Sequence, residues 1–570
     1  MNNKTRQIIV VVSVFVIALA SLGTIIGLLV NTGNMSEYSN GFRYQASGSR
    51  ITITGYEGDD EEVVVPDKIK GKRVVGIDKD AFEEKSSVVK SIKFNCTSSA
   101  FTIAEEAFAE LAALERVVLP KNIKEVANGA FKGCKALKTV IVPNSVTKIG
   151  ANAFKDCAQL KFMYHTDDYS TEGDNAIEED GIFLPTSLLE IGERAFEACT
   201  TIVDMSMKKD LEKIGDYAFY GCTRLSELTV EENSEVTSIG EWAFYNTLLN
   251  SPKPTDSRKN PMLFPNLVTI GASAFKNVKN NFVYFSIPKS VKTIGDAAFA
   301  ESSNLTTVDM AEDIQLESMG EGVFENCSQL TDITLPTGLK EIPAKTFKGC
   351  YRLLYNSDFV IGKSVEKIGD GAFAIYTGRG SSTSVTSYSR HIITVDPENE
   401  YFTTVRLEDN KREGNETSTY QQGLLTDADG TTVYAYYGSY DANSTNSLGK
   451  TFRLLDTEGN FLTDVTTIKP YAFAGVDFEY IQLNNSIKNI GEYVFFGSKV
   501  VICYMSAERF EFDGKSFDRV VEPKDNDDIE ALSDRIEVGL LATSSAVDEM
   551  MEKFREFDIV AAQYNASKLP

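Results

Sequence analysis

The chain has 570 residues, of which 57 are Lys or Arg and 82 are Asp or Glu, so its formal net charge is −25 at pH 7. This acidity argues against nucleic acid and anionic lipid headgroups as partners, since binding to both depends on basic patches. Hydrophobic residues make up 42% of the chain and aromatic residues 10%, which is the composition of an ordered protein.

The first predicted element is the run Ile8 to Val30, 23 residues without a charge. Two basic residues precede it and none follows until Arg43, which orients the rest of the chain to the outside. As a helix the run would be about 34 Å long, enough to cross a hydrocarbon core of about 30 Å. Residues 1–34 are therefore predicted to be a cytoplasmic stub with a single transmembrane signal anchor in the cell membrane. Cleavage after Ala20, which would secrete the protein, is the alternative.

Fourteen copies of one sequence motif follow this run. The motif is an aliphatic residue, three spacer residues, a small residue and Phe, as in Ile149 to Phe154. Most of these Phe residues stand 22 to 26 residues apart, which is the period of a solenoid. They are Phe82, Phe108, Phe131, Phe154, Phe196, Phe219, Phe244, Phe275, Phe299, Phe324, Phe347, Phe373, Phe473 and Phe495.

Each repeat is predicted to contain two short extended pieces and one helical turn, as Leu114 to Cys134 illustrates. Val117 and Leu119 alternate with an outward residue in the first piece, and Pro120 ends that strand because it cannot donate to a ladder. A Gly follows the second piece in most repeats and is predicted to permit a tight bend. One coil cannot bury its own apolar face, so neighbouring coils must stack. The predicted fold class is a β-rich repeat solenoid of the leucine-rich-repeat type.

The repeats resemble the BspA-like leucine-rich-repeat proteins, whose units read L-x-x-I-x-I-P-x-x-V-x-x-I-G-x-x-A-F-x-x-C. Leu137 to Cys157 matches this pattern nearly throughout, and the resemblance extends from Gly41 to about Cys503. It implies a surface-displayed protein that binds a protein or glycan on another surface, often as an adhesin toward host, matrix or other cells. The family offers no catalytic residues to transfer.

The predicted organisation places a capping hairpin first and a helical segment last. Its parts are a capping hairpin at 41–75, repeats at 76–375, a degenerate hairpin insertion at 376–467, the last repeats at 468–520 and a helical cap or tail at 524–570.

Six of the eight Cys residues stand three positions after a repeat Phe. Stacking would place them over one another in three pairs: Cys134 and Cys157, Cys199 and Cys222, and Cys327 and Cys350. Coils about 5 Å apart bring such pairs within the usual Cα range for a disulfide. The two interpretations are disulfides between neighbouring coils and buried thiols that fill the core as small apolar groups.

No metal, cofactor or catalytic site is predicted. The chain has no C-x-x-C, and its only histidines, His165 and His391, are isolated. The segments Asp427 to Gly430 and Asp456 to Gly459 resemble the start of a calcium loop but lack its later acidic ligand, so hairpin turns are preferred. An enzyme is not expected, and a wall-polymer enzyme hosted by the insertion is a remote alternative.

The insertion provides the first candidate ligand-binding residues. Tyr434, Tyr436 and Tyr437 crowd a short span beside Gly and Ser, which is the composition of adaptable binding loops. The other interpretation is a strand that packs these rings on the solenoid.

Outward strand positions provide the second set of candidates, because a solenoid sheet is a common ligand platform. The alternative is that these are solvated strand residues. They are Arg116, Tyr164, Asp204, Glu227, Tyr284, Asp309, Asp332 and Tyr480.

From Asp527 the apolar spacing becomes helical, with Ile529, Leu532 and Ile536 three and four residues apart. A second apolar stripe, from Val547 to Phe557, predicts another helix. A helical hairpin that closes the open end of the core is the expected structure.

The predicted function is macromolecular binding by a membrane-anchored extracellular protein, with adhesion as the outcome. The alternative is a structural surface protein that self-associates, through an exposed edge, the C-terminal helices or Gly23 and Gly27 of the anchor.

Overall fold

The computed structural model describes residues 37–165, 181–251, 264–311, 313–353, 358–374, 392–407, 410–411, 419–420, 422–438, 451–476, 480–498, 500, 502–505, 510–512, 514–518, 536–540, 546–557, 559 and 561–563. The expected anchor Ile8–Val30 and the cleavage point after Ala20 lie outside these ranges. Within the ranges, no helix combines the length and the apolar character needed to span a membrane.

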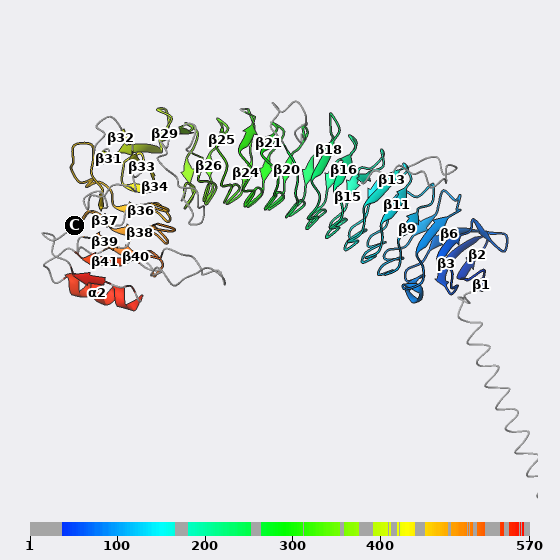
Figure 1. The fold of residues 1–570 in the computed structure, drawn as a ribbon. Helices are drawn as coiled ribbons and strands as arrows, with labels where there is room; N and C mark the ends of the chain where they lie inside the picture. The colour runs from blue at the N-terminus through cyan, green and yellow to red at the C-terminus, as the bar shows by residue number, and fades with distance from the viewer. Residues whose placement is uncertain are drawn as a thin grey trace, which may run out of the picture.

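The chain forms an elongated, curved solenoid with β1 at one end and α2 at the other (Figure 1). An N-terminal sheet opens the stack, in the order β1-β2-β3-β6-β5, with β8 also paired to β6. Its strands are β1 (Glu37–Ser39), β2 (Phe42–Ser47), β3 (Arg50–Tyr56), β5 (Lys68–Ile69), β6 (Lys72–Ile77) and β8 (Thr102–Ile103). The hairpin β2–β3 is antiparallel and buries Phe42, Tyr44 and Ile53 against the first coil.

Two parallel sheets of eight strands run along the main solenoid and overlap over its middle coils, where most coils give one strand to each sheet. The first contains β4 (Glu62–Val65), β7 (Ser91–Phe94), β9 (Arg116–Val118), β11 (Thr139–Val142), β13 (Phe162–His165), β14 (Gly181–Phe183), β16 (Asp204–Met207) and β18 (Glu227–Val230). The second contains β10 (Glu125–Val126), β12 (Lys148–Ile149), β15 (Glu190–Ile191), β17 (Lys213–Ile214), β19 (Ser238–Ile239), β20 (Thr269–Ile270), β22 (Thr293–Ile294) and β24 (Ser318–Met319).

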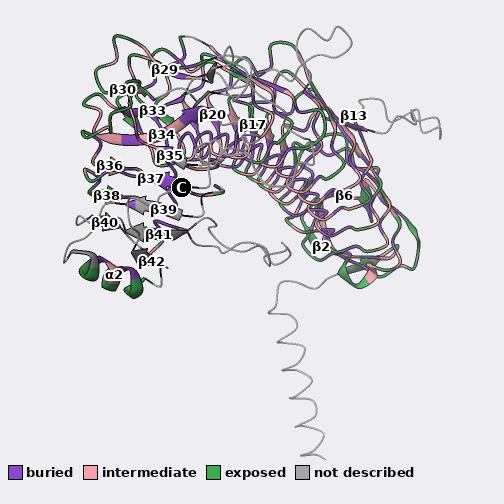
Figure 2. Cartoon of the chain, turned by 60° about the vertical axis from the view of Figure 1, so that its left-hand side comes forward, coloured by how far each residue is buried: buried purple, intermediate pink, exposed green. Residues whose placement is uncertain are grey.

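Shorter parallel sheets continue both rows toward the insertion. They contain β21 (Tyr284–Ile287), β23 (Thr307–Met310) and β25 (Asp332–Ile333), then β26 (Glu341–Ile342) with β28 (Lys367–Ile368), and β27 (Phe359–Ile361) with β29 (Ile393–Val395). Figure 2 shows the buried residues following the coil interior along this whole stretch.

The repeat Phe residues form one aromatic ladder through the core. From Phe82 to Phe373 each ring stacks or tilts against the next, with centroid distances such as 5.5 Å between Phe131 and Phe154. The ladder begins at Tyr56 of the N-terminal sheet, 5.5 Å from Phe82. Because every coil contributes one fully buried ring, the ladder explains the spacing of the Phe residues along the sequence.

The repeat Gly is required for a different reason from the bend expected from the sequence. Gly192 and Gly215 lie outside the left-handed region, but a Cβ on Gly215 would stand 2.7 Å from both Glu193 N and Gly192 C of the preceding coil. Gly at this position therefore lets the backbones of adjacent coils approach closely.

The predicted helical turn is an irregular turn in most described repeats, whereas a 3-10 helix, η1 (Glu83–Lys85), directly follows Phe82 in the first repeat. The α-helix α2 (Ala546–Glu556) lies beyond the repeat Phe positions. A residue of positive φ stands two positions before and two positions after the Phe, as Asn152 (φ 56°) and Asp156 (φ 61°) do around Phe154. The N–H groups of all three donate to carbonyl groups of the next coil at 2.8 Å. These hydrogen bonds between coils compensate for the unfavourable backbone conformation.

The cysteine row consists of free, buried thiols, so the disulfide interpretation does not hold in this structure. Each Sγ–H points along the stack to a Phe carbonyl of the preceding coil. Cys199, for example, donates to Phe154 O at 3.1 Å. Ser302 occupies the same position in its own coil and donates to Phe275 O at 2.7 Å. The thiol is therefore a hydrogen-bond donor as well as an apolar filler.

We expect Cys199→Ser to be more stable than Cys199→Ala by about 1 kcal/mol, because Ser keeps the donor that Ala removes. Urea denaturation followed by circular dichroism measures the difference. Ser302→Ala serves as the comparison and should show at least as large a loss, because Ser302 Oγ also accepts from Val278 N at 3.1 Å. If Cys199→Ala were the more stable variant, the thiol would act as an apolar filler alone.

The insertion folds as a β-sheet between two cores. Its antiparallel strands are β30 (Phe402–Arg406), β33 (Gln422–Asp427) and β34 (Thr432–Gly438), with β31 (Asn410–Lys411) and β32 (Thr419–Tyr420) as a small hairpin. Leu425 belongs to the core of the main solenoid, whereas its neighbour Leu424 belongs to a separate C-terminal core. The sheet thus contributes residues to the end of the main core and to the start of the C-terminal core.

The C-terminal coils form two further parallel ladders. One continues from β34 through β36 (Thr467–Ile468), β38 (Asn489–Ile490) and β40 (Glu511–Phe512), and the other contains β35 (Thr451–Arg453), β37 (Tyr480–Gln482), β39 (Ile502–Met505), β41 (Glu537–Leu540) and β42 (Ala561–Gln563). The rings of Phe473, Phe495 and Phe517 stack as in the main solenoid, which makes Phe517 a repeat position that the sequence pattern missed.

The expected helical hairpin at the C-terminus lies only in part within the described residues. Ile529 and Leu532 of the first predicted helix lie outside them, and Ile536, its last predicted position, directly precedes strand β41, which pairs with β39. The second helix exists as α2, whose Met550 and Phe554 are buried against the last coils. Its outer side is exposed, as Figure 2 shows in green. Solenoid pairing therefore continues to β42, and a single described helix covers the end of the core.

Candidate binding surface

Strand register brings the outward residues of the first long sheet into two parallel rows, which we call the outward sheet face. Thr139 pairs with both Arg116 and Phe162, and Asp204 pairs with Glu227, so these residues belong to one row. Two positions further along each strand, Ile141 pairs with Val118 and Tyr164, and Phe183 pairs with Ser206.

Three aromatic rings occupy the middle of the outward sheet face, and we call them the aromatic cluster. The ring of Tyr164 lies 6.2 Å from that of Phe162 and 6.1 Å from that of Phe183, and the planes are nearly parallel in both pairs. All three side chains are half-buried. Ile141, which is half-buried, extends the apolar surface on the N-terminal side, whereas Val118 is buried.

Charged residues border the aromatic cluster on both sides. Arg116 is exposed on the N-terminal side, and Asp204 and Glu227 lie on the C-terminal side. Glu227 accepts a hydrogen bond from the amide of Asn250. An apolar centre with a polar, charged border is the usual arrangement of a protein interface.

The fold disfavours ionisation of Asp204 on β16. Partial burial, and then the carboxylate of Glu227 on the next strand, raise the pKa of Asp204 above the usual aspartate value. The folded protein therefore holds this proton more tightly than the unfolded chain, and stability falls as pH rises from about 3.9 through the raised pKa.

We expect Asp204→Asn to raise the thermal unfolding midpoint modestly at pH 7, because it removes a partly buried charge that faces another carboxylate. At pH 3 the carboxyl group is protonated in both states, so the variant and the natural chain should unfold at the same temperature. Calorimetry at the two pH values measures this. A gain of equal size at pH 3 would show that the charge is not its cause.

Three predicted residues lie further along the solenoid. Tyr284 belongs to the outward row of β21 but is only 7% exposed, so the prediction that it offers an exposed ring is wrong. Its hydroxyl donates to Asp309 Oδ2 at 3.1 Å. Asp309 and Asp332 are exposed on β23 and β25, on a separate short sheet from the aromatic cluster.

The tyrosines of the insertion pack as a strand. Tyr437 is 6% exposed, and Tyr436 donates its hydroxyl to Gln422 Oε1 at 2.8 Å while its ring meets Phe473. Tyr434 meets the ring of Phe402 edge-on. Of the two interpretations, the structure shows at β34 the strand that packs its rings on the core, and not the adaptable tyrosine loop. Tyr480 lies half-buried on β37, in the C-terminal ladder.

The hairpin interpretation of the two acidic turns holds. The Asp427 carboxylate accepts hydrogen bonds from Thr431 N at 2.7 Å and Thr432 N at 3.0 Å. Asp456 does the same for Glu458 N and Asn460 N. Among the described residues, no three His, Cys, Asp or Glu side chains gather where they could hold a metal ion.

Sequence reasoning overlooked a second aromatic group, on the turn side of two consecutive coils. It contains two stacked pairs, Tyr217 with Trp242 and Tyr220 with Tyr245. The Arg194 guanidinium lies 4.1 Å from the Tyr217 ring and the Lys276 ammonium 5.6 Å from the Trp242 ring. Because neighbouring rings and cations occupy these ring faces, we assign the group to coil stacking.

The repeat chemistry matches a known family across most of the chain. The model of the BspA type leucine rich repeat region matches residues 75–188, 180–260, 257–377 and 456–525. The chain belongs to this BspA-type family. In this chain, the recurring positions of the BspA-type repeat correspond to the aromatic ladder, the repeat Gly and the cysteine row.

Several solved structures are similar to this BspA-type chain, whereas no curated protein matches it. A leucine rich cell surface protein from Faecalibacterium prausnitzii is 21% identical, with a TM-score of 0.34, over 60% of this chain and 86% of that one. A leucine-rich repeat protein from Bacteroides ovatus is 22% identical, with a TM-score of 0.38, over 60% and 92%. The pneumococcal vaccine antigen PcpA is 13% identical, with a TM-score of 0.36, over 93% and 97%.

Proposed function

We propose that this BspA-type chain is a cell-surface binding protein, which uses the outward sheet face to hold a protein or glycan on another surface. Adhesion to host, matrix or other cells is the proposed outcome. The observation that carries the proposal is the aromatic cluster of Phe162, Tyr164 and Phe183 on a rigid sheet. In the same proposal, Ile8–Val30 anchors the chain in the cell membrane with the repeats outside.

The physical basis is the large contact area that rigid aromatic rings offer. Each ring has only two side-chain torsions to fix, so burying it against a partner costs little conformational entropy. Stacked strands already hold the three rings in place, which reduces that cost further. Arg116 on one side and Asp204 and Glu227 on the other provide polar contacts that orient the partner.

Binding of the full-length chain to arrayed matrix proteins, glycans and whole cells tests the proposal. We expect saturable binding that falls by about tenfold to a hundredfold in the triple variant Phe162→Ser, Tyr164→Ser and Phe183→Ser, since a single hot-spot aromatic at an interface contributes about 2 kcal/mol. The matched control replaces three exposed hydrophobic residues elsewhere, Leu189, Val360 and Tyr401, by Ser.

Equal loss in the triple variant and in its control would contradict the assignment to the outward sheet face. Absence of saturable binding, together with concentration-dependent assembly in light scattering, would favour the self-associating structural protein instead. Unchanged thermal unfolding of both variants is the check that the solenoid remains folded.

A further inference from the structure

The outward sheet face carries opposite charges on the two sides of the aromatic cluster. Lys93 and Arg116 lie on β7 and β9, whereas Asp204 and Glu227 lie on β16 and β18. Arg116 is exposed and Asp204 is half-buried. Within the part of the chain that the structure describes, neither of these two residues forms an ion pair. Their charges are therefore not neutralised within the chain.

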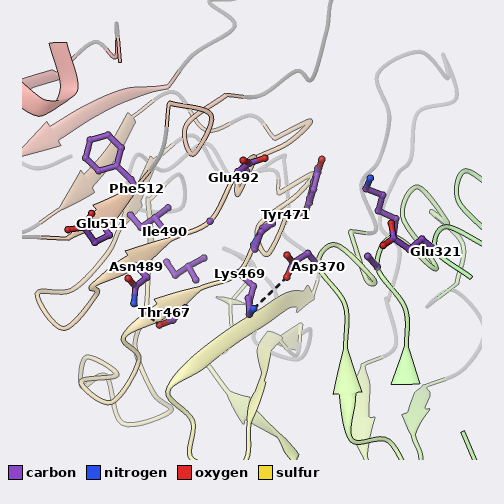
Figure 3. A pocket seen from close by; sticks show the side chains of 15 residues that line it. Glu321, Asp370, Thr467, Lys469, Tyr471, Asn489, Ile490, Glu492, Glu511 and Phe512 are labelled. Carbon is purple, nitrogen blue, oxygen red and sulfur yellow. Dashed lines mark hydrogen bonds and ion pairs between the residues drawn. The ribbon is translucent and has the colours of Figure 1, made fainter. Parts of the chain in front are cut away.

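The groove where the main solenoid meets the C-terminal coils differs from this face (Figure 3). It has a volume of about 720 Å³. Two of its carboxylates are already paired, since Lys469 Nζ lies 3.6 Å from Asp370 Oδ1 and Lys553 Nζ lies 3.1 Å from Glu511 Oε2. Its apolar lining, such as Phe512, is buried in the C-terminal core. The groove thus offers less apolar surface than the half-buried rings of the aromatic cluster.

The charges of the outward sheet face are placed symmetrically about β13. One row of the face runs over β9, β11, β13, β14 and β16, and it consists of Arg116, Thr139, Phe162, Gly181 and Asp204. Arg116 and Asp204 each lie two strands away from Phe162. A second copy turned by 180° about an axis along β13 therefore places its Asp204 over Arg116 and its Arg116 over Asp204.

The second row is apolar about the same strand. Tyr164 lies on β13, with Ile141 on β11 and Phe183 on β14 as its neighbours. The same rotation places Ile141 of one copy over Phe183 of the other. Gly181 contributes by its lack of a side chain, because a Cβ there would stand only 3.1 Å from Phe183 Cε2. The ring of Phe183 can thus lie across β14, and the aromatic cluster covers both rows at the centre of the face.

We infer that the partner of the outward sheet face is a second copy of this chain, bound face to face about a two-fold axis along β13. The inference rests on the proposed function and names its partner. Each Arg116 meets Asp204 of the other copy, and the two aromatic clusters pack together at the axis. Because such an interface uses the same surface of both copies, assembly stops at the dimer.

The usual geometry of packed sheets accommodates this arrangement. Face-to-face sheets cross at about −30°, so strands that lie about 10 Å from the axis are displaced by roughly 5 Å along their length. The long side chain of Arg116 can span this displacement. Five strands of about four residues cover roughly 300 Å² of sheet, less than the about 800 Å² per partner of a stable complex. We therefore expect a weak dimer, and many copies must act together to hold two surfaces.

The two-fold axis also reverses the direction of the stack. The N-terminal sheet lies at one end of the solenoid (Figure 1), so the N-terminal ends of the two copies point in opposite directions. Chains anchored through Ile8–Val30, as proposed above, would then meet from two facing membranes. This orientation fits contact between two cells better than contact between neighbours in one membrane.

Energy transfer between donor-labelled and acceptor-labelled copies of the full-length chain, in detergent and over a concentration series, tests the inference. We expect saturable self-association that is at least tenfold weaker in Arg116→Asp and in Asp204→Lys, since each reversal places like charges opposite each other twice. A mixture of one variant with the other should regain the natural affinity within about threefold. In the mixed dimer, both positions again pair opposite charges.

The mixture also separates a lost contact from a lost fold, because a chain that fails to fold is not rescued by another variant. Arg555→Asp is the matched control for Arg116→Asp. Arg555 is exposed on α2, and its replacement changes the net charge equally. This control should self-associate as the natural chain does, whereas the aromatic-cluster triple variant should remain monomeric.

Equal self-association of the natural chain and Arg116→Asp would overturn the inference, since association would then use another contact, such as the anchor. A mixture that regains no affinity, open-ended assembly, or a natural chain that stays monomeric would overturn it as well. The proposed function survives these results if the triple variant still loses binding to arrayed proteins, glycans or cells. A charge-dependent dimer without such binding supports the inference and restricts adhesion to cells that display the same chain.

Discussion

Replacing Phe219 by Ala is expected to lower the free energy of unfolding by about 3–5 kcal/mol. The ring is fully buried, and its centroid lies 5.4 Å from that of Phe196 and 5.2 Å from that of Phe244. Its removal leaves a cavity between two neighbouring coils, and the stability of a repeat array depends on such contacts between nearest neighbours. Urea denaturation followed by circular dichroism measures the loss.

The same experiment includes an exposed phenylalanine as its control. Phe461 is 40% exposed, so Phe461→Ala should cost less than about 1 kcal/mol. We also expect the Phe219→Ala chain to unfold in two transitions, because the weakened junction separates the coils on either side of it. Similar losses for the two variants would show that the aromatic ladder does not dominate the stability of the core.

Replacing Gly215 by Ala is expected to destabilise the protein by about 1–3 kcal/mol although the change adds a single methyl group. The new Cβ would stand 2.7 Å from two backbone atoms, Glu193 N and Gly192 C, and backbone atoms have no rotamer with which to avoid it. The two coils must therefore move apart and lose hydrogen bonds. Thermal and urea unfolding both report the effect.

Gly338→Ala is the matched control, since a Cβ at Gly338 would meet nothing within 4 Å and its φ lies outside the left-handed region. This variant should be neutral or more stable by up to about 1 kcal/mol, because Ala restricts the unfolded chain. A Gly215→Ala chain as stable as the Gly338→Ala chain would mean that the backbones of neighbouring coils can accommodate an added methyl group without loss of stability.

The repeat positions were predictable because the same motif, with a Phe for the buried core, recurs many times along the sequence. A buried ring every 22 to 26 residues predicts the ladder at Phe131 and Phe154, and the row of Cys134 and Cys157 follows from the same alignment. The reason for the Gly was not predictable. A bend and a close approach both require Gly, and only the distance between Gly215 and the preceding coil distinguishes them.

The left-handed turn residues could not be found from residue type. Arg194 and Tyr217 adopt positive φ in this fold although neither is typical of that conformation. Hydrogen bonds to the next coil determine the backbone conformation of these residues, and the residue types near them in the sequence do not predict it. Directly after Ile536, the pairing of β41 with β39 is a contact between distant parts of the chain, which no local spacing predicts.

The candidate surface was predicted in part. Tyr164 was identified as an outward residue, but its neighbours Phe162 and Phe183 were not. Phe162 could have been found by strand alternation, since it stands two residues before Tyr164 on β13, whereas Phe183 belongs to a strand that follows β13 only after residues 166–180. Conversely, strand alternation placed Tyr284 outward without revealing that it is covered. Alternation predicts the direction of a side chain, whereas exposure also depends on elements far away in the sequence.

The direction of the hydrogen bonds between coils has a mechanical consequence. They run from one coil to the next, as from Asn152 N to Glu193 O, so a pulling force between the two ends of the arc would load them one coil at a time. Each coil that yields, such as the 23 residues from Phe131 to Phe154, would lengthen the chain from a rise of about 5 Å to roughly 75 Å. The array would thus extend one coil at a time under tension, before the attachment at either end of the chain had to break.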